Sequence, residues 1–87
     1  METPRKIPQN FIASPVDDEI VLIDMAGGEL FSLKGAARAT WDLIDGESSI
    51  EEIVGSLVAE YDVEPAEAAG DVVELLRELE SAGLVAC

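Results

Sequence analysis

The chain has 87 residues, of which 48% are hydrophobic, and it carries 5 Lys and Arg against 19 Asp and Glu. This length suits one small domain, and the apolar content is enough for a packed core, so the acidity is not a sign of disorder. The formal charge of −14 repels phosphate backbones and anionic lipid surfaces. We therefore expect a peptide or protein partner with basic character, and neither nucleic acid nor membrane.

The sequence contains no histidine and a single cysteine, Cys87. These counts exclude an internal disulfide, histidine-based acid–base catalysis and nearly every zinc or iron–sulfur site. The acidic segment around Gly46 fails as a calcium loop, because Trp41 and Leu43 stand where acidic ligands are required. Neither a signal peptide nor a membrane-spanning run is predicted. We expect a cytoplasmic, non-catalytic protein with no metal and no cofactor, and we assign no role to Cys87.

The first third of the chain predicts a three-stranded antiparallel sheet. An edge strand is expected at about 7–14, a segment bounded by prolines. The second strand, 19–25, holds four consecutive apolar residues, three of them β-branched. The third strand, 29–33, follows Gly27 and Gly28, and adjacent glycines supply the positive φ angles of a tight hairpin turn.

The remainder of the chain predicts three helices. The first, at about 35–45, has apolar residues at helical spacing and ends at a glycine stop. The second, 49–61, begins with two overlapping capping boxes, and the third, 65–82, begins at a proline. Three strands followed by three helices predict an α+β, winged-helix-like fold. We expect a single domain over 1–87, with 1–6 flexible.

Apolar residues cover an unusually wide part of the third predicted helix. Its apolar arc spans about 180°, whereas a surface helix needs roughly 100° to cover its core. Leu75 lies on one flank of this arc, and Asp71 and Glu78 rim that flank. Two interpretations are open: the helix packs centrally against its neighbours and the sheet, or the flank lines a groove that a partner fills.

The order of these elements and several local sequence patterns resemble the PqqD-like proteins. The matching patterns are the hairpin 21–33, the helix end Trp41–Gly46, the capped helix start Ser49–Val54 and the segment from Tyr61 to Val85. The resemblance covers about residues 16–86. Lys34 and Gly35 depart from the family pattern, which usually shows an asparagine after the strand, and this departure concerns the cap of the first helix.

The resemblance implies a precursor-peptide recognition element, which binds the leader region of a ribosomally made peptide and delivers the peptide to modifying enzymes. The chain looks most like the free-standing leader-binding proteins of lasso-peptide biosynthesis. Those proteins work beside a cysteine-protease-like leader peptidase and an asparagine-synthetase-like cyclase. A peptide chaperone for a radical-SAM maturation enzyme is the alternative within the family. In either case, the resemblance implies that the leader adds as a strand beside the third strand and lies against the third helix.

The residues themselves favour the same mode of binding. The strand 29–33 ends the predicted sheet, so its unpaired backbone groups form a template for an added strand. The apolar flank of the last helix provides pockets for side chains, and its acidic rim favours leaders with lysines. The predicted peptide-binding residues are Glu29, Leu30, Phe31, Ser32, Leu33, Ala68, Asp71, Val72, Leu75, Glu78 and Leu79.

Other classes of protein fit the sequence less well. A DNA-binding winged helix has the same order of elements, but the second and third predicted helices carry one basic residue between them, Arg77. A small enzyme would have to work without histidine and without a glycine-rich phosphate loop. A generic acidic protein-interaction module, unrelated to peptide modification, stays open as an alternative.

Overall fold

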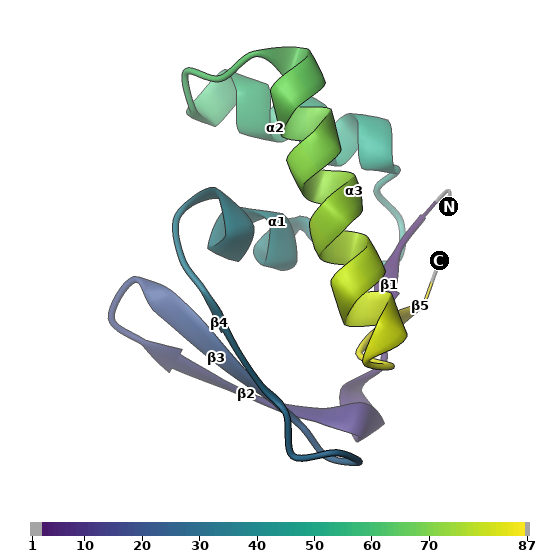
Figure 1. Cartoon of the computed structure of the whole chain (residues 1–87). Helices are drawn as coiled ribbons and strands as arrows, with labels where there is room; N and C mark the ends of the chain where they lie inside the picture. The colour runs from purple at the N-terminus through teal and green to yellow at the C-terminus, as the bar shows by residue number, and fades with distance from the viewer. Residues whose placement is uncertain (1–2, 87) are drawn as a thin grey trace.

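The computed structural model describes residues 3–86, which form two small sheets and three helices (Figure 1). The main sheet has the antiparallel order β2-β3-β4, with strands β2 (Phe11–Val16), β3 (Glu19–Asp24) and β4 (Leu30–Leu33). The helices are α1 (Ala36–Leu43), α2 (Ile50–Glu60) and α3 (Pro65–Ser81). The predicted α+β class and the order of strands and helices are confirmed.

β3 is the central strand, and its side chains alternate between the two faces of the sheet. Ile20 and Leu22 are buried against the helices, and they pair with Leu33 and Phe31 of β4. Directly opposite residues of an antiparallel pair share a face. The inner face of β4 therefore consists of Phe31 and Leu33, whereas Leu30 lies on the outer face.

The turn before β4 is organised by a buried carboxylate. Asp24 accepts hydrogen bonds from the backbone N–H groups of Ala26 (3.0 Å) and Gly27 (3.3 Å), which compensates for its burial. Gly28 has a φ of 72°, a conformation that glycine adopts without steric cost. The expected glycine turn is thus present, and it sets the direction in which β4 returns along β3.

The start of α2 has the predicted capping box. The Ser49 hydroxyl accepts from the Glu52 backbone N–H at 3.1 Å, and the Glu52 carboxylate accepts from the Ser49 backbone N–H at 2.9 Å. The second predicted box does not form, because Ser48 instead donates its backbone N–H to Asp45 at 2.7 Å. At α1, Gly35 with a φ of 56° is the N-terminal cap, and no side chain caps this helix. The departure from the family pattern at this position therefore changes a cap and leaves the helix in place.

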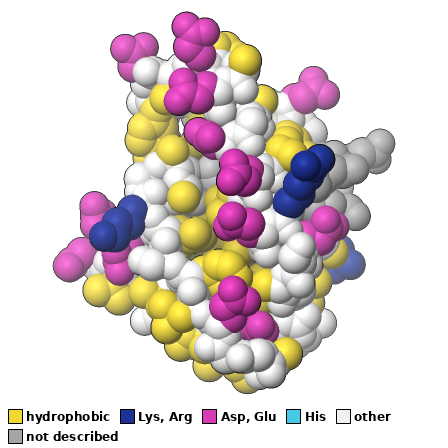
Figure 2. Space-filling view, viewed as in Figure 1, with side chains coloured by type: hydrophobic (Ala, Val, Ile, Leu, Met, Phe, Trp, Pro, Cys, Tyr) yellow, Lys and Arg dark blue, Asp and Glu magenta, His cyan; other side chains and the backbone are white. Residues whose placement is uncertain are grey.

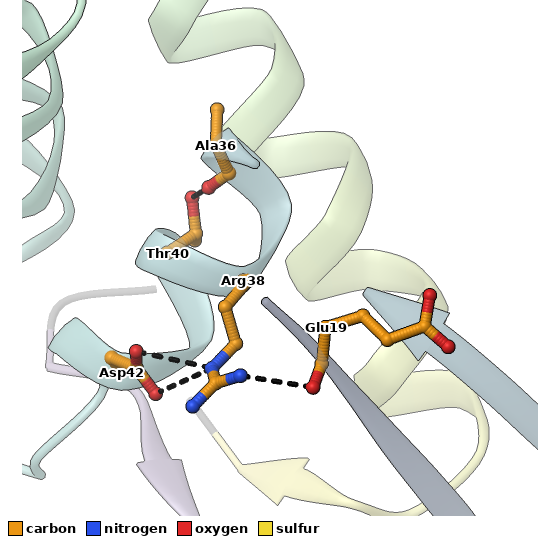
Figure 3. Close-up of polar contacts among 5 residues, drawn as sticks. All are labelled: Glu19, Ala36, Arg38, Thr40 and Asp42. Carbon is orange, nitrogen blue, oxygen red and sulfur yellow. Dashed lines mark hydrogen bonds and ion pairs between the residues drawn. The ribbon is translucent and has the colours of Figure 1, made fainter. Parts of the chain in front are cut away.

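Helix α1 is tied to the start of β3 by one arginine (Figure 3). The Arg38 guanidinium donates to the Glu19 carbonyl oxygen at 2.9 Å and pairs with the Asp42 carboxylate at 3.2 Å. Within the helix, the Thr40 hydroxyl donates to the Ala36 carbonyl at 2.7 Å, so this buried polar group is satisfied. Of these bonds, the one from Arg38 to the Glu19 carbonyl joins α1 to the main sheet.

The two ends of the described chain meet in a second sheet that the sequence does not predict. β1 (Arg5–Lys6) pairs antiparallel with β5 (Val85–Ala86). The Lys6 ammonium lies 4.5 Å from the centre of the Trp41 ring, and burial lowers the pKa of Lys6. Part of the segment 1–6, expected to be flexible, is therefore a paired strand. Met1, Glu2 and Cys87 lie outside the described residues.

The first strand of the main sheet is displaced from its predicted position, 7–14. Pro8–Asn10 forms a 3-10 turn, and β2 continues through Pro15 to Val16. Proline is compatible with β2 because this strand lies at the edge of the sheet. The Asn10 side chain donates to the Gly83 carbonyl at 2.8 Å, which fixes the turn beside the end of α3. The other predicted elements agree with the structure to within two residues at each end.

The core lies between the inner face of the main sheet and the three helices. It consists of Ile20, Leu22, Leu33, Trp41, Ile44, Ile53, Leu57, Val72, Leu76, Leu79, Leu84 and Val85. Helix α3 supplies the buried side chains Val72, Leu76 and Leu79, so the centre of its apolar arc packs as a central helix does. The flank of α3 that carries Leu75 is only half-buried, and it borders the candidate site.

Candidate functional site

The first component of the site is the open edge of β4. Four residues of β4 pair with β3, and no other strand among residues 3–86 pairs with its second edge. The N–H and C=O groups on that side are therefore available to another extended chain. β2 forms the opposite edge of the sheet, but Pro15 lacks an N–H donor there. Of the two edges, β4 is the better template for an added strand.

The second component is one flank of α3. Asp71, Leu75, Glu78 and Ala82 stand at positions i, i+4, i+7 and i+11, so they form one stripe along the helix. The two acidic residues are exposed, whereas Leu75 and Ala82 are half-buried against the core. Figure 2 shows a column of acidic side chains along this flank, with hydrophobic side chains beside it. The flank is thus an apolar strip with a carboxylate border.

Three adjacent hollows form a furrow along this flank. The upper pocket, of about 200 Å³, lies between the three helices and is lined by Ala36, Ala37, Thr40, Leu57, Tyr61, Val63, Ala68, Asp71, Val72 and Leu75. A shallow middle hollow of about 250 Å³ shares Asp71 and Leu75 with it and adds Glu74 and Glu78. The lower hollow, of about 540 Å³, shares Glu78 and connects α3 to Glu29 and Phe31 beside β4. Neighbouring hollows share lining residues, and we call the three of them together the furrow.

The furrow has a strongly negative border. Helix α3 carries Glu67, Asp71, Glu74, Glu78 and Glu80, and its single cation is Arg77. The three acidic residues at the middle hollow are exposed, so they act through long-range attraction and pay no desolvation cost in the free protein. This arrangement can attract a basic ligand and bury apolar side chains beneath its charges.

The structure brings most of the predicted site residues to the furrow. Ala68, Asp71, Val72 and Leu75 line the upper pocket, and Glu29, Phe31 and Glu78 line the lower hollow. Val72 and Ala68 are themselves buried, so they form the floor of the pocket.

Four predicted site residues do not line the furrow. Leu33 and Leu79 are 6% and 0% exposed and belong to the core, so their side chains have little surface to offer a ligand. Leu30 and Ser32 are exposed, and the strand register places them on the face of β4 away from the helices. Contact between a peptide and these four residues stays a prediction. For the three that belong to β4, the predicted contact is made by their backbone N–H and C=O groups.

Several furrow residues were not predicted from the sequence. The upper pocket is also lined by Ala36 and Ala37 at the start of α1, and by Tyr61 and Val63 in the connection that follows α2. Their apolar character indicated core positions, and nothing in the local pattern indicates which of them face an opening. The exposed Val63 in the short α2–α3 connection is the one available signal.

Within residues 3–86, no group of three or more His, Cys, Asp or Glu side chains is arranged to hold a metal ion. Asp45, the acidic residue of the segment around Gly46, accepts backbone N–H bonds from Glu47 and Ser48 instead. None of the helices in the described part of the chain combines the length and the hydrophobicity that crossing a bilayer requires. The groups that the furrow offers to a ligand are the backbone edge of β4, apolar side chains and carboxylates.

The fold and the site define a winged-helix-like α+β domain with an open strand beside an acidic helix. The family model of coenzyme PQQ synthesis protein D (PqqD) matches residues 19–85. The chain therefore belongs to the PqqD family, which confirms the resemblance seen in the sequence.

Two solved structures are similar to the chain over nearly its whole length. One, described as TbiB1 in complex with the TbiA(beta) leader peptide, has a TM-score of 0.80 and 31% identity, covering 92% of this chain and 93% of that one. The other, described as lasso peptide synthetase B1 complexed with the leader peptide, has a TM-score of 0.83 and 25% identity, covering 98% and 99%. No curated protein matches the chain significantly.

Proposed function

We propose that this chain binds the leader region of a ribosomally made precursor peptide by strand addition to β4. The observation that carries the proposal is the open edge of β4 beside a furrow with an apolar floor. Two structures of similar fold, 31% and 25% identical, are described as complexes with leader peptides. Their similarity covers the strands and helices that form the furrow, which supports the same use of this surface.

In this mode of binding, the backbone and the side chains of the leader make different contacts. An added strand takes its affinity from main-chain hydrogen bonds to β4, and its alternate side chains point toward and away from α3. The side chains that point toward α3 meet Phe31 in the lower hollow and Leu75 higher in the furrow. The upper pocket, of about 200 Å³, can accept one large apolar side chain.

Charge selects among leaders. The carboxylates of Asp71, Glu74 and Glu78 border the furrow, so a leader with lysine or arginine near its apolar residues associates faster than an acidic one. The net charge of −14 adds a general attraction for basic peptides and a general repulsion for nucleic acids. The proposed ligand is therefore a leader with apolar anchors and basic neighbours.

The chain itself catalyses nothing in this proposal and acts in the cytoplasm. It delivers the bound precursor to a leader peptidase and an asparagine-synthetase-like cyclase, as in lasso-peptide maturation. The similarity to a lasso peptide synthetase B1 supports this setting. The match to PqqD favours a second candidate, a peptide chaperone for a radical-SAM maturation enzyme.

The test is titration of a labelled leader peptide from the precursor gene beside this one, with amide hydrogen exchange of both states. We expect saturable binding and new protection along Leu30–Leu33, because an added strand bonds to that backbone. A leader of scrambled sequence and equal charge is the control, and it should bind at least about tenfold more weakly. Equal binding of both peptides, or protection elsewhere only, would contradict the proposal.

A further inference from the structure

The outer face of the main sheet carries an apolar row that the helices do not cover. Ile12 of β2, Ile23 of β3 and Leu30 of β4 are directly opposite one another in the strand register. Ile12 is 52% exposed and Leu30 is 62% exposed, and between them Ile23 is half-buried. Val16, on the same face of β2, is also exposed. We call Ile12, Val16, Ile23 and Leu30 the outer-face patch.

Single exposed apolar residues are ordinary on protein surfaces, whereas contiguous ones mark interaction sites. Three side chains in register on adjacent strands lie about 5 Å apart and form one surface. Leader side chains in the furrow lie on the α3 side of the sheet, so within the patch only Leu30, on β4 itself, would neighbour an added strand. The patch therefore calls for a different occupant.

The charges around the patch indicate the chemistry of that occupant. The segment 11–34 has one cation, Lys34, and its ammonium pairs with the Glu19 carboxylate at 3.2 Å. Asp17 and Asp18 are exposed at the β2–β3 turn, directly after Val16. A second copy of this chain would bring together two molecules that each have a net charge of −14, which like-charge repulsion opposes. A protein with an apolar surface bordered by basic side chains is complementary to the patch.

We propose that the outer-face patch is the docking surface for a maturation enzyme that presents an apolar surface bordered by Lys and Arg. The inference rests on the proposed function, in which the chain delivers its bound peptide to such enzymes. It assigns two faces of one sheet to two tasks. The furrow side holds the leader, and the outer face holds the enzyme.

The geometry couples leader binding to enzyme binding. A leader strand beside β4 would contribute its alternate side chains to the outer face, next to Leu30, so it would extend the patch by one strand. The enzyme then binds the leader-loaded chain more tightly than the free chain. By linkage, the enzyme strengthens leader binding by the same factor.

The test uses Ile12→Lys, because β3 separates β2 from the leader-binding edge. The matched control is Ala59→Lys, which adds the same charge at an exposed position on α2. The leader peptidase and the cyclase encoded with the precursor are each purified and titrated against wild type and both variants, with and without leader peptide. We expect Ile12→Lys to weaken binding of one of the enzymes by about tenfold or more. Ala59→Lys should change it less than about twofold, and leader affinity should be unchanged in both variants.

Each other outcome overturns the assignment. If both enzymes bind Ile12→Lys as they bind wild type, or if neither binds wild type, the patch is not their docking surface. If sedimentation shows a wild-type dimer that Ile12→Lys dissociates, a second copy occupies the patch. Failure of the proposed function is seen separately, as absence of leader binding by wild type, and enzyme binding to the free chain still tests the patch in that case.

Discussion

Leu75 and Leu76 are neighbours on α3 with opposite environments, and they make the sharpest test of the furrow. Leu76 is 0% exposed and lies in the core. Leu75 is half-buried and lines both the upper pocket and the middle hollow. Truncation of each to alanine removes the same atoms, so any difference in outcome reports the difference in position.

The expected magnitudes follow from burial. Leu76→Ala removes a fully enclosed side chain and should lower the free energy of unfolding by about 2–5 kcal/mol. Leu75→Ala removes a side chain that is already in part accessible to solvent, and it should cost about 1 kcal/mol. If Leu75 contacts the leader, its truncation should reduce leader affinity about tenfold or more, which corresponds to about 1.4 kcal/mol. Leu76→Ala should leave the affinity of the folded fraction nearly unchanged.

Urea denaturation measures stability, with the fluorescence of the single tryptophan as the probe. Trp41 is 2% exposed, so unfolding moves it from an apolar environment into water. Leader affinity is measured by fluorescence anisotropy without urea, and protein concentrations are corrected for the folded fraction. If Leu75→Ala unfolds the domain while its folded fraction binds the leader normally, the furrow assignment is refuted and this flank of α3 serves packing alone.

Two further predictions concern charge. The association rate of the leader should fall as the salt concentration rises from about 0.05 to 0.5 M, while the dissociation rate changes little. The reason is that exposed carboxylates such as Asp71 and Glu78 attract the leader at long range, and salt screens this attraction over about 8 Å at physiological ionic strength. Stopped-flow mixing measures this, and a rate independent of salt would leave the acidity as a solubility feature. Hydrogen bonds from the backbone N–H groups of Ser48 and Glu47 hold the pKa of Asp45 below its usual value of 3.8. The Asp45 carboxylate therefore stabilises the fold above pH 3.8, and this contribution is lost as the pH falls through the lower pKa of the folded state. The stability difference between wild type and Asp45→Ala, from denaturation at several pH values, should therefore be constant near neutrality and shrink below pH 3.8; a difference that persists in acid would show that these hydrogen bonds do not favour the charged form.

Local sequence patterns were sufficient to predict most of the elements of this fold. The β-branched run of Glu19–Asp24 predicts a strand because such side chains fit a pleated, half-buried surface. Ser49 and Glu52 predict the start of α2 because their reciprocal hydrogen bonds need only residues three positions apart. The acidic flank of α3 also follows from helical spacing, and it indicated Leu75 as a residue outside the centre of the core.

Contacts between distant residues decided the rest. The pairing of Arg5–Lys6 with Val85–Ala86 joins the two ends of the described chain, and strands of two residues carry no periodic pattern of their own. Leu33 and Leu79 lie in the core, and apolar periodicity alone shows which side of an element is buried but not whether protein or ligand covers it.

The furrow and the outer-face patch are likewise products of tertiary structure. The walls of the upper pocket come from all three helices, so they exist only once those helices have packed. The row of Ile12, Ile23 and Leu30 depends on the register of three strands, and a shift of one residue would move each side chain to the other face. The sequence by itself determined which segments form strands and helices and where the negative charge lies, because those properties depend on near neighbours. Only the tertiary structure decided which apolar side chains stay open to a partner, because that depends on what the rest of the chain covers.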